Sequence, residues 1–352
     1  MYRSCSRICA LLLILGEAAV PALAQPKSEP SVADVALLQG EARAQRLNDG
    51  ARKEGGLTIY AAMPAEDLVA LVDAFTRKTG IKVTTWRSSS EGLVQRIVAE
   101  ARSGRYSVDI VQNNAPATSE LGREHLLQEV RSPFHADLMP QAVPARREWV
   151  GLYVLVFLQV YNTTKVKKDE LPASYADLRH PRWKGRLGIE ADDQPWFAYV
   201  LKELGEEQGT KLFKDIVRSN GISVRKGHTL LSNLVASGEI PLSLTVYSNR
   251  PLQMKREGAP VDWFVIPPAI AQFTSIALLK RAPHPHAAML FYDFLLSDGQ
   301  QILAERDFVP TSNKIDAPLK KLPLKFIDPE LFLDMNDKWV RDFNDVFQNR
   351  TR

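Results

Sequence analysis

A run of three serines is the segment of this chain best suited to bind an anion. The run comprises Ser88, Ser89 and Ser90, and it stands between a strand-like segment and a helix-like one. The free N–H groups of a helix N-terminus, together with neighbouring hydroxyls, bind anions. Ser88 and Glu91 also have the spacing of a capping box, so simple helix capping is the alternative interpretation.

Two further polar segments follow strand-like runs and are candidates for solute contacts. Asn113 and Asn114 carry amides that either hydrogen-bond a polar ligand or shape a turn. In the segment 190–196, Glu190 offers a carboxylate to an amine or a cation, and Trp196 could stack on a ring or an ammonium group. Pro195 suits a first helical position, so solvated capping charges are the alternative there.

The histidines do not have the spacing of a metal or catalytic motif. His284 and His286 lie two residues apart at an expected helix start, with no third ligand nearby. The others are scattered along the chain: His125, His135, His180 and His228. Nucleophile-elbow, phosphate-loop and metal-hydrolase motifs are also missing from the sequence. These patterns favour a protein that is not an enzyme and holds no resident cofactor.

The segments around these loops alternate between strand and helix patterns. Apolar runs at 57–61, 81–86 and 108–111 predict strands, and helical spacing at 64–80 and 88–102 predicts helices between them. Such alternation is the signature of a doubly wound α/β sheet. Ligands of these sheets bind where loops leave the carboxyl ends of the strands, which is where the serine and asparagine segments lie.

The middle of the chain predicts a second unit of the same style. The apolar run 151–161 is too long for one ordinary strand, and it is consistent with a strand that leaves one sheet and enters another. Strands are expected at 187–190, 222–224 and 242–246, before segments 264–266 and 274–279 return to the first unit. Helices near 285–296 and 329–349 close the chain.

The first residues have the pattern of a cleavable secretory signal. A short basic region with Arg3 and Arg7 precedes an apolar run at 10–15, and small residues lead to an expected cleavage after Ala24. Both cysteines, Cys5 and Cys9, fall inside this signal. We therefore expect a periplasmic protein whose mature form lacks cysteine, which excludes thiolate catalysis and cysteine metal ligands.

Length and charge narrow the class of partner. A chain of 352 residues corresponds to about two domains, and 45% hydrophobic with 24% charged residues is ordinary for a globular protein. The net charge of +4 is small, and basic residues are interspersed with acidic ones, so nucleic acid is not an expected partner. After the signal, no apolar run approaches the roughly 20 residues of a membrane helix.

Several motifs give the chain a family resemblance. The segments are ARKEGGLTIY at 51–60, FTRKTGIKV at 75–83, YNT at 161–163, LP at 171–172, YADL at 175–178, PRWKGR at 181–186, ASGEI at 236–240, KREGAPV at 255–261, and the run 283–300. They resemble the type II periplasmic solute-binding proteins of ABC importers, and most of all the ferric-iron-binding branch and its relatives. The resemblance covers roughly residues 45 to 315.

The resemblance implies a two-lobed α/β fold in which each lobe is a doubly wound sheet flanked by helices, joined by crossing hinge strands. We expect a signal peptide at 1–24, a leader and helix at 25–55, lobe 1 at 56–160, lobe 2 at 161–266, and a return to lobe 1 at 267–352. It also implies that the lobes close on a ligand and that a membrane permease recognises the closed form.

The resemblance also singles out Tyr247 as a ligand contact. The iron-binding branch carries two adjacent tyrosines here that bind ferric iron as phenolates, whereas this chain has Tyr247 followed by Ser248. The histidine and carboxylate that often complete those iron sites are replaced by the segments 63–65 and 112–114. Ferric iron prefers anionic oxygen donors, so the sequence favours another ligand.

The sequence therefore predicts a monomeric periplasmic component of an ABC importer that binds a small polar or anionic solute, such as a carboxylate, phosphonate or phosphorylated metabolite. Two alternatives stay open at this point. One is transport of ferric iron with a synergistic anion, in which Tyr247 would be the metal ligand. The other is solute sensing for a membrane receptor.

Overall fold

The computed structural model describes residues 30–348 of the chain. The predicted signal peptide 1–24 and its cleavage site lie outside these residues. Within the described range, none of the helices combines the length and the apolar character that a membrane span requires.

The first lobe is built on the predicted alternation of strands and helices. Strands β1 (Gly56–Ala61), β2 (Lys82–Arg87) and β3 (Ile110–Asn114) are parallel, in the order β2-β1-β3. Its helices are α1 (Val32–Ala36), α2 (Arg43–Glu54), α3 (Ala65–Thr79), α4 (Ser90–Arg102) and α5 (Ala115–Arg123). Helix α3 buries Leu68, Leu71 and Phe75 on one face, and it ends where Gly80 takes a left-handed φ of 74°.

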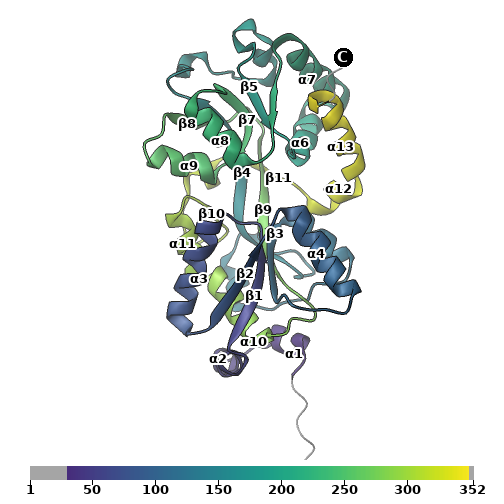
Figure 1. Cartoon of the computed structure of the whole chain (residues 1–352), viewed down its shortest axis with the longest axis vertical. Helices are drawn as coiled ribbons and strands as arrows, with labels where there is room; N and C mark the ends of the chain where they lie inside the picture. The colour runs from purple at the N-terminus through teal and green to yellow at the C-terminus, as the bar shows by residue number, and fades with distance from the viewer. Residues whose placement is uncertain (1–29, 349–352) are drawn as a thin grey trace, which may run out of the picture. The chain divides into compact units, whose positions relative to one another are not determined.

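Two long strands connect the lobes. Strand β4 (Val150–Asn162) is fully buried and pairs with β9 (Ala269–Leu278) up to Val156, then with β7 from Phe157 onwards. The long apolar run predicted to leave one sheet and enter another is confirmed by this change of partner. The path of the sheet among the described residues is β2-β1-β3-β9-β4-β7-β5-β6, and β4 and β9 lie at its centre (Figure 1).

The second lobe also contains parallel strands that alternate with helices. Its strands are β5 (Leu187–Glu190), β6 (Ser223–Arg225), β7 (Leu242–Tyr247) and β8 (Val261–Phe264). β5 is parallel to both β6 and β7. Its helices are α6 (Gln194–Leu204), α7 (Glu206–Asn220), α8 (His228–Ser237) and α9 (Asn249–Arg256).

The chain then returns to the first lobe and finally runs along the second. α10 (Pro285–Leu296), α11 (Asp298–Glu305), β10 (Val309–Pro310) and β11 (Leu324–Phe326) are followed by α12 (Pro329–Asp334), α13 (Asn336–Phe343) and a π-helical turn, η7 (Asn344–Gln348). Short 3₁₀ helices lie at Pro133–Asp137, Pro140–Ala142, Lys168–Glu170, Tyr175–Arg179, Pro181–Trp183 and Pro318–Lys321. Helix α12 contacts α5 of the first lobe and α13 contacts α6 of the second.

Buried side chains form two hydrophobic clusters that match this arrangement. One centres on the first lobe and the crossing strands, with Phe75 and Phe291 in edge-to-face contact. The other fills the second lobe around Trp183, Phe197 and Phe213. The fold class is therefore confirmed as a two-lobed α/β fold, while the residue boundaries given above for the lobes stay predictions.

Candidate functional site

The serine run lies at the start of α4, but its capping differs from the prediction. Ser89 is the N-cap, and its Oγ accepts a hydrogen bond from the backbone N–H of Gly92 at 3.2 Å. Ser88 and Glu91 form no capping box, because the helix begins at Ser90 and its cap is Ser89. Helix capping by one serine of the run, the alternative interpretation, is therefore observed. The contact between this run and a ligand stays a prediction.

Asn113 and Asn114 hold two helix starts together. Asn113 Nδ2 donates to the backbone oxygen of Ser90, and Asn114 Nδ2 donates to Ser90 Oγ, both at 3.0 Å. Asn114 Oδ1 accepts from the N–H of Ala117 at 2.8 Å and caps α5. Since these amides already have partners within the chain, the interpretation that they shape the turn has the stronger support.

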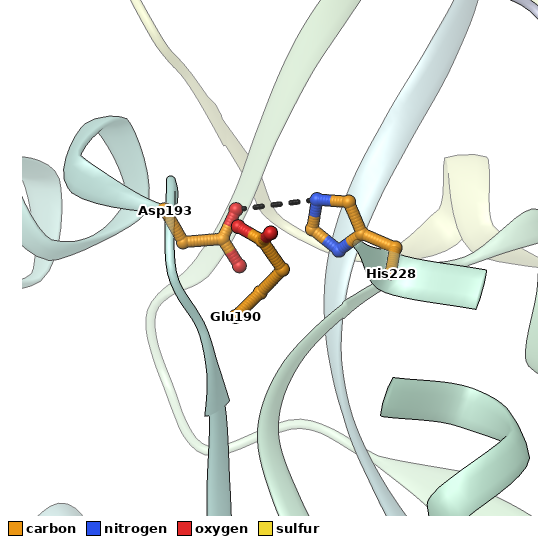
Figure 2. Close-up of side chains that lie close together, drawn as sticks. All are labelled: Glu190, Asp193 and His228. Carbon is orange, nitrogen blue, oxygen red and sulfur yellow. Dashed lines mark ion pairs between the residues drawn. The ribbon is translucent and has the colours of Figure 1, made fainter. Parts of the chain in front are cut away.

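Three titratable side chains of the second lobe converge at the carboxyl ends of its strands. Glu190 ends β5, Asp193 is the N-cap of α6, and His228 begins α8 just after β6. The loops meet because β5 and β6 are parallel neighbours, with Glu190 in register with Arg225. Ligand atoms of the three side chains lie within 4.8 Å of one another, as Figure 2 shows. We call these three residues the acid–histidine cluster.

Hydrogen bonding leaves two atoms of this cluster free. Glu190 Oε1 accepts from the N–H of Gly227 at 2.7 Å, and Glu190 Oε2 accepts from the N–H of Asp192 at 2.5 Å. His228 Nε2 lies 3.4 Å from Asp193 Oδ1. Asp193 Oδ2 and His228 Nδ1 are buried and have no hydrogen-bond partner. Buried polar atoms are rarely left unpaired, so these two atoms are candidates to bind a ligand.

Tyr247 joins the cluster from the end of β7. Its ring stacks on the imidazole of His228, with centroids 3.5 Å apart and planes inclined by 28°. Gln272 of the crossing strand β9 donates through Nε2 to Tyr247 Oη at 2.8 Å, and Gln272 Oε1 is a third buried atom without a partner. The site therefore combines second-lobe side chains with a crossing strand that both lobes share.

The charges in the site favour its protonated forms. Burial, reinforced by the charge of Asp193, raises the pKa of Glu190 to about 7. Burial alone would lower the pKa of His228, but the carboxylates of Asp193 and Glu190 outweigh it and raise the pKa. Burial and the same two carboxylates raise the pKa of Tyr247 well above its usual value. A protonated phenol and a protonated imidazole beside the Asp193 carboxylate form a set of hydrogen-bond donors and acceptors.

Trp196 does not belong to this site. It is 1% exposed, and its ring packs edge-to-face against Tyr175 and Phe213 in the core of the second lobe. Stacking on a ligand is therefore not supported, because the helix that begins beside Asp193 turns this side chain inward. Of the second-lobe residues predicted from the sequence, Glu190 and Tyr247 are brought together and Trp196 is not.

Sequence reasoning missed His228, and it did not single out Asp193 among the carboxylates of the segment 190–196 that could hold an amine or a cation or cap the helix. His228 belonged to the scattered histidines, since its distance from Asp193 along the chain matches no motif. The available signal was its position just after a short strand, next to Gly227, at the same sheet edge as Glu190. The paired histidines lie elsewhere, with His284 Nδ1 3.1 Å from Asp109 Oδ2 and His286 Nδ1 2.7 Å from Glu54 Oε1.

Comparison with known proteins places the chain in a family. Residues 70–323 match the family model described as bacterial extracellular solute-binding protein. The chain is 25% identical over 310 residues to the Fe(3+)-binding periplasmic protein of Serratia marcescens, covering 85% of this chain and 91% of that protein.

Two solved structures share the fold. Iron-bound HitA from Pseudomonas aeruginosa has a TM-score of 0.72 at 23% identity, covering 83% of this chain and 99% of its own. The periplasmic binding protein AfuA from Actinobacillus pleuropneumoniae, with exogenous fructose-6-phosphate bound, has a TM-score of 0.73 at 21% identity, covering 84% and 99%. The chain belongs to the family of bacterial extracellular solute-binding proteins.

Proposed function

We propose that this chain captures a small polar organic solute between its two lobes and delivers it to the permease of an ABC importer. The observation that carries the choice of an organic solute is the pair of buried, unpartnered atoms Asp193 Oδ2 and His228 Nδ1, beside the phenol of Tyr247. One carboxylate acceptor and two neighbouring donors suit hydroxyl or amine groups. The site binds its solute without converting it, and export takes the protein to the periplasm.

Hydrogen bonding to an organic solute fits these residues better than ferric coordination does. Both oxygens of Glu190 already accept backbone N–H groups, so this carboxylate would have to give up hydrogen bonds to bind a metal. Burial and the carboxylates of Asp193 and Glu190 raise the pKa of Tyr247 well above its usual value, so ferric iron would have to displace a firmly held phenol proton. Asp193 is therefore the one anionic oxygen donor of the cluster that is free for a ligand.

The proposal is tested by thermal unfolding of the mature protein with a panel of solutes. The panel contains sugars, sugar phosphates, carboxylates, polyamines and ferric citrate, each at the same ionic strength. A ligand that binds only the folded state raises the unfolding temperature. We expect stabilisation by a hydroxylated or aminated organic compound, and loss of it in His228→Gln. Stabilisation by ferric citrate alone would contradict the proposal.

Ferric iron is the second candidate, and one observation favours it. The ligand atoms of Glu190, Asp193 and His228 lie close enough to surround one ion, and the Serratia relative is named for binding Fe(3+). A ferric titration with and without phosphate or citrate tests this candidate in the visible spectrum. A tyrosinate-to-iron charge-transfer band that disappears in Tyr247→Phe would establish it. Absence of a band with each anion would remove it.

A further inference from the structure

We propose that Arg250 binds an anionic group of the transported solute. This inference rests on the proposed function and deepens it, since it adds a negative charge to the polar solute that the acid–histidine cluster receives. Arg250 lies in the first turn of α9, three residues after Tyr247. The sequence did not predict a function for Arg250.

The packing of α9 directs Arg250 toward the junction between the lobes. Gln253, one turn further along α9 and on the same face, donates through Nε2 to the backbone oxygen of Arg306 at 2.9 Å. Arg306 Nε in turn lies 2.5 Å from Asp67 Oδ1, in the first turn of α3. The second lobe thus rests on the first at this point, and Arg250 lies one turn closer to β7 than the contact itself.

The chain geometry places Arg250 beside the site, because β7 ends at Tyr247 and α9 begins two residues later, at Asn249. Burial raises the pKa of Asp67, and the positive charges of Arg306 and Arg250 oppose that rise. Burial raises the pKa of Tyr153, and the charge of Asp67 adds to it. Tyr153 is itself among the groups that act on Tyr247. The charge of Arg250 therefore acts on Asp67, at the point where the two lobes meet.

Near the start of α9, Arg250 is a cation without an ion-pair partner among the described residues. Arg306 is paired with Asp67, and Lys226 lies 3.2 Å from Asp192. Within the described part of the chain, the guanidinium of Arg250 makes no hydrogen bond and no ion pair, and its Nε is buried without a partner. Arg250 is half-buried, and leaving its buried Nε donor without a partner costs free energy. A guanidinium matches carboxylate and phosphate groups in a bidentate geometry. An arriving anionic group would supply the missing partner.

One other partner for Arg250 exists within the chain. Asp67 Oδ2 is also buried and unpartnered, so a movement of the lobes could join it to Arg250 directly. The existing contact favours the solute, because Arg306 Nε already lies 2.5 Å from Asp67 Oδ1 and Asp67 would have to be shared between two arginines. The experiment must therefore separate binding of an added anion from pairing with Asp67.

The test uses inorganic phosphate as the probe, and it needs no knowledge of the full solute. Thermal unfolding of the mature protein is followed against phosphate concentration, with chloride added to equal ionic strength. We expect phosphate to stabilise the wild type, and Arg250→Gln to raise the apparent Kd for phosphate at least about ten-fold, the loss typical of a charge-assisted pair. Arg250→Lys should fall between the two, since it keeps the charge without the planar fork.

Arg256→Gln is the matched control, because it removes an arginine from the same helix. Arg256 Nη1 lies 2.9 Å from Asp307 Oδ2, so its charge is already used and the phosphate response should persist. An equal response in Arg250→Gln and the wild type would overturn the inference, since phosphate would then bind elsewhere. A response that appears only in Asp67→Asn would also overturn it, because Asp67 would then be the partner of Arg250.

The two proposals fail separately. If the solute panel identifies an organic ligand but phosphate gives no shift that depends on Arg250, only the assignment of Arg250 is wrong. If phosphate binding depends on Arg250 but no organic solute in the panel stabilises the protein, the assignment stands and the proposed function is wrong.

Discussion

Replacing Asp193 by Asn tests the site most sharply, because it changes one buried carboxylate and almost nothing in volume. Asp193 is 1% exposed, its Oδ2 has no partner within the chain, and its Oδ1 lies 3.4 Å from His228 Nε2. A hydrogen bond from a solute to a charged acceptor contributes about 1.5–3 kcal/mol. Its loss should therefore weaken binding by about 10- to 150-fold.

The assay is isothermal titration of the solute that the thermal panel identifies, with Asp192→Asn as the control. Asp192 is the next residue along, but its carboxylate is half exposed and paired with Lys226, so its removal should change Kd by less than about five-fold. The same Asp193→Asn protein should show a lower pKa for His228 by NMR, since burial then acts with less opposition. Equal affinity in the two variants would refute the assignment of Asp193.

Three further predictions concern the rest of the molecule. Burial and Asp193 raise the pKa of Glu190 from 4.5 to about 7, so between these values the folded state holds a proton that the unfolded state releases. Urea unfolding should therefore show stability falling by about 2 kcal/mol from pH 5 to 7, and a stability that rises over this window would contradict this. Arg43→Ala should lower the free energy of unfolding in urea by about 3–5 kcal/mol, because it leaves the buried carboxylate of Asp293 without its ion-pair partner. Arg43 contacts this carboxylate through Nη1 and Nη2. A decrease below about 1 kcal/mol would show that water screens the pair. Gly151→Ala should lower the free energy of unfolding in urea by about 1–3 kcal/mol, because the added Cβ would lie 2.8 Å from Phe273 Cδ1 in the crossing strands. An unchanged urea midpoint would mean that the Phe273 ring moves aside without cost.

Sequence patterns among residues close together along the chain predicted much of the fold. Strand β1, helix α3 and strand β2 follow from periodicity, with Gly80 marking the end of α3, because each of these features depends on neighbours along the chain. The apolar run 151–161 also indicated a strand shared by two sheets, because it is longer than an ordinary strand, and β4 (Val150–Asn162) contains it.

The site was predicted only in part, because its residues meet through the sheet. Glu190 and His228 are far apart in sequence, and only the parallel pairing of β5 with β6 brings their loops together. The direction of a side chain at a helix start is not visible in the sequence either. Asp193 faces the site, whereas Trp196, three residues later, is buried in the core.

Native mass spectrometry of the protein purified from the bacterium that produces it tests the central claim most directly. We predict an adduct with the mass of a small organic solute on the protein, present in Asp192→Asn and strongly reduced in Asp193→Asn. An adduct with the mass of a single iron ion, reduced in Tyr247→Phe and accompanied by no organic solute, would contradict the account.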